Sequence, residues 1–352
     1  MWEEILLGWP RDIVALRLAH FTNFYSGDAH RLRDSIARVL PLWEAAEPAY
    51  PHVLAMWAFG LEESGDYARA EEAGRRAVEL DPANIWAVHA VAHVMEMQGR
   101  AAEGLAWIDD TEPAWAECNN FAYHVWWHRA LFHLERGEHD AVLEGYDRQF
   151  RADAESEDYL DMSNAIAMLW RLELEGVDVG ARWRELADKS EGRIGDHVLA
   201  FIDVHWAMAL AADGRRAALD RMLATMAAAA AADTSQAPIY RRVGSALCEG
   251  LIAYRAGDPE TAVERLLPIR YDVATIGGSH AQRDVVHQTL IAAALAAGRD
   301  CLARALLAER VAARPNSLPT WLRYAACLDR LGDGAALAAA GARARAAELR
   351  AS

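Results

Sequence analysis

The residues best suited to chemistry are five histidines within positions 84–134, out of thirteen in the 352-residue chain. His89 and His93 are four residues apart, and so are His124 and His128. On a helix this spacing places both rings of a pair on the same face. Two such pairs on neighbouring helices would offer three or four imidazole nitrogens, enough for zinc or another divalent ion.

Three interpretations of these residues remain open. The histidines are structural, or they form a recognition site with Trp86 and Trp127, or they are catalytic through a metal or through histidine–carboxylate acid–base chemistry. The segment lacks the glutamate that follows a ligand in the His-Glu-x-x-His motif. The catalytic candidates are His89, His93, Glu96, His124 and His128, and the candidate metal ligands are the same four histidines. The cofactor is otherwise unknown.

Further polar and aromatic residues are predicted to line the same groove or to face it. Ser279 is expected to cap a helix, and Arg283 to pair with a carboxylate of the ligand or of the protein. The competing interpretation gives Arg283 and Asp284 salt bridges between repeats, and gives Asp203 and His205 a packing role. The predicted groove residues are His52, Glu62, Trp86, Trp127, Asp203, His205, Ser279, His280, Gln282, Arg283 and Asp284.

The elements that must position these residues are helices, because apolar residues recur at i, i+3, i+4 and i+7 along the chain. Glycines recur at intervals of 34 to 43 residues, each where one helix is expected to end and the next to begin. They are Gly27, Gly65, Gly99, Gly137, Gly176, Gly214, Gly257, Gly298 and Gly332. Helix pairs at such a period are typical of an α-solenoid.

The segment 51–82, PHVLAMWAFGLEESGDYARAEEAGRRAVELDP, resembles the tetratricopeptide repeat. Ala58, Ala70 and Ala77 occupy positions where its helices approach closely. The resemblance implies an all-α fold, an α-solenoid of about nine helical hairpins forming a right-handed superhelix of roughly one turn. We expect a single domain, 1–352, with longer connections at 233–238 and 268–283.

A more specific resemblance is carried by WAVHAVAHVMEMQGR (86–100), YHVWWHRAL (123–131), LDMSNAIAMLWRLELEGVDVGARW (160–183) and GGSHAQRDV (277–285). These segments are similar to the tetratricopeptide repeat protein 38 family and its bacterial members. Residues 1–10 look like an incomplete terminal unit. We therefore expect either that the natural chain extends upstream or that a second copy covers this edge as a homodimer.

Composition excludes several classes of function. The formal net charge is −16, with one lysine, so binding to nucleic acid or to an anionic membrane is not expected. No apolar run approaches the roughly 20 residues that span a bilayer, and the start lacks a signal-peptide pattern. The four cysteines are far apart in sequence, which favours reduced thiols and a cytoplasmic protein.

We therefore predict a tetratricopeptide-like protein that binds a small molecule, peptide or protein partner in its concave groove. The alternatives are an enzyme that uses the same histidines, with or without a divalent metal, and an assembly scaffold. No phosphate-binding loop, dinucleotide fingerprint or nucleophile elbow occurs in the sequence.

Overall fold

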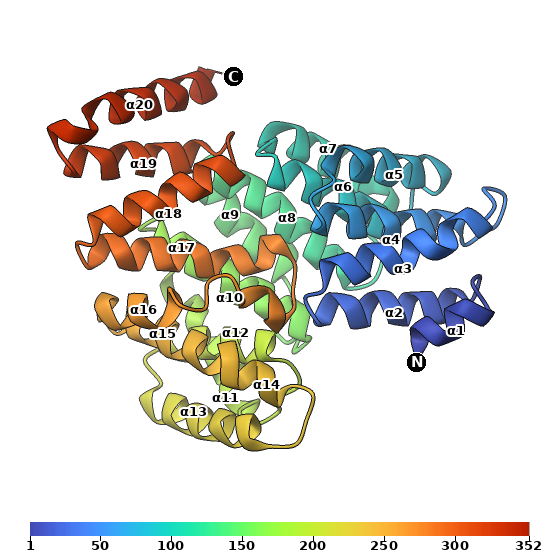
Figure 1. The fold of residues 1–352 in the computed structure, drawn as a ribbon, viewed down its shortest axis with the longest axis horizontal. Coiled ribbons are helices and arrows are strands. Elements are labelled where there is room, and N and C mark those ends of the chain that lie inside the picture. The colour runs from blue at the N-terminus through green and yellow to red at the C-terminus, as the bar shows by residue number, and fades with distance from the viewer. Residues whose placement is uncertain (352) are drawn as a thin grey trace.

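The computed structural model describes residues 1–351, which form helices and connecting turns without any strand (Figure 1). After a short helix, α1 (Trp2–Gly8), these residues form nine helical hairpins. The first four pair α2 (Ile13–Tyr25) with α3 (Ala29–Val39), α4 (Tyr50–Glu63) with α5 (Tyr67–Leu80), α6 (Ile85–Met97) with α7 (Ala101–Trp115), and α8 (Phe121–Glu135) with α9 (His139–Gly145). The α9 helix continues as a π-helical turn, η2 (Tyr146–Phe150), and a 3-10 turn, η1 (Leu40–Leu42), follows α3.

The remaining hairpins lead to the C-terminal end of the ring. They pair α10 (Tyr159–Leu174) with α11 (Trp183–Gly192), α12 (Ala200–Ala212) with α13 (Arg216–Ala231), α15 (Ser245–Arg255) with α16 (Pro259–Leu266), α17 (His280–Ala296) with α18 (Asp300–Ala313), and α19 (Leu318–Arg330) with α20 (Ala336–Ala351). Shorter turns join them: η3 (Gly180–Arg182), α14 (Ala237–Ile239), η4 (Tyr240–Gly244), η5 (Val273–Ile276) and η6 (Asp333–Ala335).

The nine turn glycines all adopt the predicted left-handed conformation, with φ between 66° and 82°. An L-residue with a side chain rarely adopts this conformation, and glycine does so at little cost. The hairpin period read from the sequence is therefore confirmed, and the chain is an all-α solenoid.

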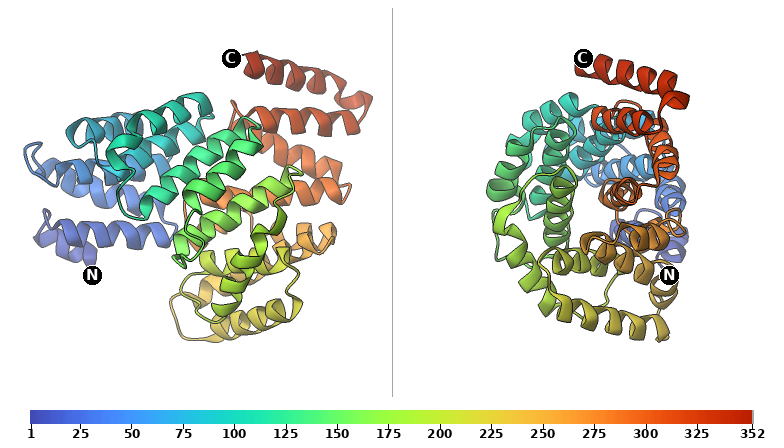
Figure 2. Two further views of the ribbon diagram at one scale, coloured as in Figure 1. Left: turned by 180° about the vertical axis from the view of Figure 1, so that it is seen from behind. Right: turned by 90° about the vertical axis from the view of Figure 1, so that its left-hand side faces the viewer.

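The solenoid closes on itself after about one turn, as the end-on view in Figure 2 shows. A Cβ at Gly27, in the first hairpin turn, would lie 1.8 Å from the Ala274 carbonyl oxygen of η5. Asn316, before α19, donates a hydrogen bond from Nδ2 to the Gln98 carbonyl at 2.8 Å. Segments 218 and 247 residues apart in sequence are thus in direct contact.

Helix α17 lies inside the ring and contacts α6, α10 and α15. The Trp170 indole of α10 donates to Thr289 Oγ1 at 2.9 Å, and Arg171 donates to the Ala281 carbonyl at 2.7 Å. The concave surface on which the groove was predicted is therefore partly filled by a helix of the chain itself.

Two connections differ from their predicted bounds. Helix α14 begins at Ala237, so the 233–238 connection is shorter than expected. The connection predicted at 268–283 contains η5 and ends at Ser279, because residues 280–283 form the first turn of α17. Ser279 caps that turn as predicted, through a capping box with Gln282.

The N-terminal helix α1 contacts α2 and buries Leu6 against Ala15 and Leu16. Among the helices within residues 1–351, none is long and apolar enough to cross a membrane.

Candidate functional site

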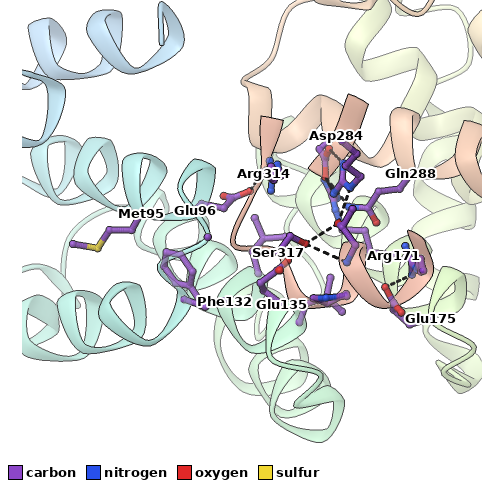
Figure 3. A pocket seen from close by; sticks show the side chains of 18 residues that line it. Met95, Glu96, Phe132, Glu135, Arg171, Glu175, Asp284, Gln288, Arg314 and Ser317 are labelled. Carbon is purple, nitrogen blue, oxygen red and sulfur yellow. Dashed lines mark hydrogen bonds and ion pairs between the residues drawn. The ribbon is translucent and has the colours of Figure 1, made fainter. Parts of the chain in front are cut away.

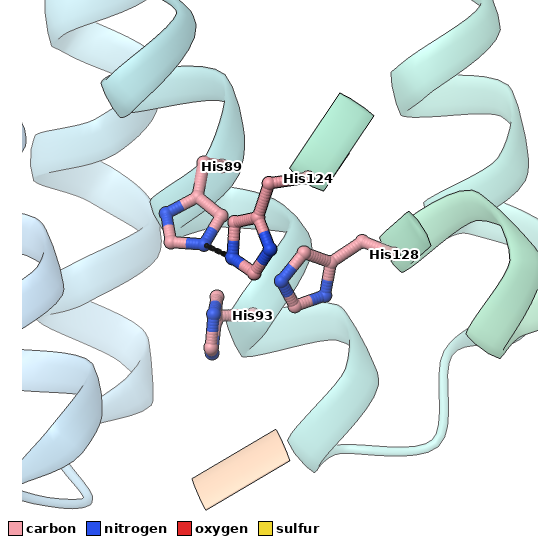
Figure 4. A group of neighbouring side chains, drawn as sticks. All are labelled: His89, His93, His124 and His128. Carbon is pink, nitrogen blue, oxygen red and sulfur yellow. Dashed lines mark hydrogen bonds between the residues drawn. The ribbon is translucent and has the colours of Figure 1, made fainter. Parts of the chain in front are cut away.

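Four histidines converge between two adjacent first helices (Figure 4). His89 and His93 project from α6, and His124 and His128 project from α8. Each offers a ring nitrogen, and these nitrogens all lie within 4.8 Å of one another. All four side chains are buried, and His93 and His128 have no exposed surface. The i, i+4 spacing thus aligns each pair on one helix face, and hairpin stacking brings the two faces together.

Polar side chains on other helices lie beside three of the rings, and two of them are within hydrogen-bond distance of a ring nitrogen. Asn164 on α10 is hydrogen-bonded to His124 Nδ1 at 2.8 Å. The Glu96 Oε2 atom lies 3.1 Å from His128 Nδ1, and Glu62 Oε2 lies 3.6 Å from His93 Nδ1. Histidine ligands of metals are typically held this way, with one nitrogen on a carboxylate or amide and the other on the ion.

Several buried polar atoms of the cluster have no hydrogen-bond partner. They are both ring nitrogens of His93, Nε2 of His128 and both carboxyl oxygens of Glu62. A buried polar atom left without a partner costs about 1–3 kcal/mol. A cation bonded to the inward-facing nitrogens would remove part of this cost.

One distance within the cluster is close to the separation of two nitrogens on a small divalent ion. The Nε2 atoms of His89 and His124 are 3.0 Å apart and share a hydrogen bond. Two nitrogens bound tetrahedrally at about 2.0–2.1 Å would lie about 3.3 Å apart. A shift of a few tenths of an ångström would therefore convert this contact into a pair of metal ligands.

Burial keeps the imidazoles neutral. It lowers the pKa of His128 to about 3 and holds the pKa values of His89, His93 and His124 well below their usual value. For His89, the neighbouring imidazoles add to this effect. Neutral imidazole is the form that binds metals, so near pH 7 the lone pairs do not have to be freed from protons.

The carboxyl groups beside the cluster are also shifted. Burial raises the pKa of Glu62 well above its usual value, and the charges of Glu63 and Glu96 act in the same direction. Burial likewise raises the pKa of Glu96, although Arg314 opposes it. Glu62 is thus suited to hold a proton next to His93.

The start of α17 seals the cluster from the opposite side of the ring. His280 donates its backbone N–H to Glu63 Oε1 at 2.9 Å, and the Arg283 guanidinium lies 3.4 Å from Glu63 Oε2. Gln282 Nε2 donates to Asn164 Oδ1 at 3.3 Å. A relay of hydrogen bonds therefore connects this segment through Asn164 to His124 and His89.

A network of buried charges lies next to Glu96, between α6, α8 and the C-terminal hairpins (Figure 3). Arg314 lies 3.6 Å from Glu96 Oε1, and Arg310 donates to Asp284 Oδ2 at 2.9 Å. Burial works against ionisation of Asp284, but Arg310 and Arg314 hold its pKa well below the usual range. The enclosed space is only about 40 Å³, so this network closes the ring and leaves no room for a ligand.

A cavity of about 420 Å³ opens beside the cluster. The edges of His89 and His124 reach it, whereas His93 and His128 lie behind them. Its walls are mostly aromatic or aliphatic, and its volume is within the range of small-molecule sites. The apolar lining includes Phe21, Phe24, Phe59, Trp86, Phe121, Leu160, Leu199, Phe201 and Ile202.

The predicted groove residues divide between this site and other places. Trp86 lines the cavity and stacks on Phe121, whose ring centroid is 3.7 Å away. Trp127 is fully buried and stacks behind His124 at 5.5 Å. Gln282 reaches the cavity wall. Trp127 therefore supports the histidines and cannot touch a ligand.

Other predicted groove residues do not reach the cavity. His52 is exposed in the first turn of α4, ahead of the α4 residues that line the cavity, and its Nδ1 lies 3.2 Å from the Asn84 amide. Asp203 binds Tyr240 and His197, the latter at 2.9 Å. His205 is hydrogen-bonded to the Phe201 carbonyl at 2.7 Å. These three residues therefore have local structural contacts.

Asn164, Glu63 and Arg17 also belong to the site and are absent from the predicted set. Asn164 is detectable as the amide that directly precedes the apolar run 165–170 of α10. Stacking of α4 on α6 brings Glu63 to His93, and stacking of the first repeats brings Arg17 to Trp86. Local pattern carried no signal for either.

Comparison with known proteins adds the following. No family model matches the sequence. A tetratricopeptide repeat protein from Parabacteroides merdae is similar at 13% identity over 78% of this chain and 97% of that chain, with a TM-score of 0.39. A human IFIT1 dimer with m7Gppp-AAAA is similar at 14% identity over 93% of this chain and 69% of that chain, with a TM-score of 0.36.

Proposed function

We propose that this α-solenoid is a metal-dependent protein whose four-histidine centre acts on a small apolar molecule bound in the adjoining cavity. The observation that carries the proposal is the convergence of four buried, neutral imidazoles, in which both ring nitrogens of His93 and Nε2 of His128 have no hydrogen-bond partner. Such atoms are costly unless something binds them. The Glu96, Glu62 and Asn164 contacts supply the outer support that metal-binding histidines need.

The four histidines would have different roles because only two of them reach the cavity. His93 and His128 would anchor the ion from behind, while His89 and His124 would face both the ion and the cavity. When bound, a divalent ion supplies Lewis-acid activation of a ligand oxygen or of water. Glu62 lies beside His93 and has a raised pKa, so it would act as a nearby proton donor or acceptor.

A test of the metal site is equilibrium dialysis of the protein, without a histidine tag, against Zn²⁺ and Co²⁺. We expect one ion per chain, and intense Co²⁺ d–d absorption from a tetrahedral nitrogen site. The His93→Ala, His128→Ala double variant should bind none. His133→Ala is the matched control, since its ring on α8 is instead paired with Glu138 at 2.7 Å. Undiminished binding by a folded double variant would sink the proposal.

A metal-free binding protein is the second candidate, favoured by the existing hydrogen bond between His89 and His124. In that case the histidine edges would recognise a polar group of the ligand, and the aromatic walls its apolar part. Ligand binding that is unchanged by chelators would support this alternative. We also propose that the chain is related to the tetratricopeptide repeat protein 38 family and that the protein is cytoplasmic.

A further inference from the structure

The cavity beside the histidines contains one unusual charge. The guanidinium of Arg17, on α2, lies 3.9 Å from the ring centroid of Trp86 and 4.1 Å from that of Phe21. Within the part of the chain that the structure describes, Arg17 makes no ion pair and its guanidinium no hydrogen bond. The arginines that close the ring, Arg310 and Arg314, are by contrast each close to a carboxylate.

The cavity lining holds no aspartate or glutamate among residues 1–351, although the chain has 52 acidic residues. A protein of net charge −16 has carboxylates available to most of its arginines. Arg17 instead lies against the rings of Phe21 and Trp86, and the half-exposed Tyr25 is also near. The positive charge is thus left uncompensated at an aromatic wall.

The geometry also fixes the guanidinium in place. Trp86 stacks on Phe121 with a centroid distance of 3.7 Å, so Arg17 covers the other face of the indole. The cation–π contact holds the flat face of the guanidinium against the indole. The N–H donors, which lie in the guanidinium plane, remain free to bind a ligand. A carboxylate can receive two of these donors side by side.

We propose that the cavity selects a small monocarboxylic acid with an apolar body, whose carboxylate pairs with Arg17 while the body lies against the aromatic walls. This names the ligand class for the proposed function and therefore rests on it. The other end of such a ligand would extend toward the cavity edges of His89 and His124. Partial burial, which lowers the pKa of Arg17 to about 10, still leaves it charged at pH 7.

The test compares 4-phenylbutyrate with its neutral isostere 4-phenylbutyramide by isothermal titration calorimetry. The wild type should bind the acid at least about tenfold more tightly than the amide, because hydrogen bonds to a charged group are worth about 1.5–3 kcal/mol. Arg17→Met, which keeps an unbranched apolar side chain, should lose this preference and still bind the amide. Arg75→Met is the control, because Arg75 lies over Trp107 at 4.7 Å in another part of the protein.

Each titration is run on chelator-treated protein and on protein with one equivalent of Zn²⁺. An Arg17-dependent preference without metal binding would support this inference and refute the metal centre. Metal binding without such a preference would do the reverse. Equal affinities for acid and amide in the wild type, or no binding of either at millimolar concentration, would overturn the inference. So would a preference that persists in a folded Arg17→Met variant.

Discussion

The carboxylate of Glu96 should control metal affinity without being a ligand itself. It lies 3.1 Å from His128 Nδ1, the nitrogen facing away from the cluster. Loss of such a partner typically lowers metal affinity 10- to 100-fold. Glu96→Gln keeps the shape and removes the negative charge, so it is the perturbation of choice.

The effect converts into a melting-temperature shift. Zinc at about 100 times its Kd stabilises the folded wild type by about 2.7 kcal/mol. With an unfolding entropy of about 2.1 cal/mol/K per residue over 352 residues, that is a shift of about 4 °C. At the same zinc concentration, a 10- to 100-fold weaker site retains about 1.4 to 0.4 kcal/mol, or about 2 to 0.5 °C.

The assay is differential scanning fluorimetry of tag-free protein with EDTA and with zinc. Glu264→Gln is the matched control, since Glu264 is an exposed residue of α16. It should show the full wild-type shift. Equal zinc shifts in wild type and Glu96→Gln would refute the supporting role of this carboxylate, and no shift in the wild type would refute the centre itself.

Three further predictions concern stability and support of the site. Burial lowers the pKa of His20 to about 3, so below pH 6.5 this histidine binds a proton in the unfolded chain and not in the folded chain. The wild type should therefore lose stability as the pH falls from 7.5 to 5. Chemical denaturation should show that His20→Phe removes about 2 kcal/mol of this loss. Gly278→Ala places a Cβ only 2.5 Å from the Phe201 ring at a φ of 79°, and should lower the free energy of unfolding in urea by roughly 2–4 kcal/mol. Gly298→Ala has open space around the new Cβ and should lower it by about 1 kcal/mol. Asn164→Leu leaves His124 Nδ1 without its partner and should lower zinc affinity by about tenfold in dialysis, and an unchanged affinity would contradict the relay.

Much of the fold could be predicted from the sequence because it repeats a local rule. Each turn needs a residue with positive φ, and glycine marks it at Gly65, Gly137 and the other turns. The two histidine pairs could be predicted for the same reason, because residues four apart on a helix lie on the same face. Local periodicity was sufficient for both.

The cavity could not be predicted in this way. Its walls come from α2, α4, α6, α8, α10, α12, the first turn of α17 and the segment before it, and they meet only because the superhelix closes. That closure depends on contacts such as Gly27 against Ala274 and His280 against Glu63. The position of His52 within its repeat predicted that it faces the groove. That position shows which face of the helix a residue occupies, but it does not show how far along the helix the cavity extends.

The most direct measurement of the central claim is anomalous X-ray scattering from crystals grown with zinc. The account predicts one strong anomalous peak per chain at about 2.0–2.1 Å from imidazole nitrogens of His89, His93, His124 and His128. Absence of a peak among these rings, with the hydrogen bond between His89 and His124 intact, would contradict it.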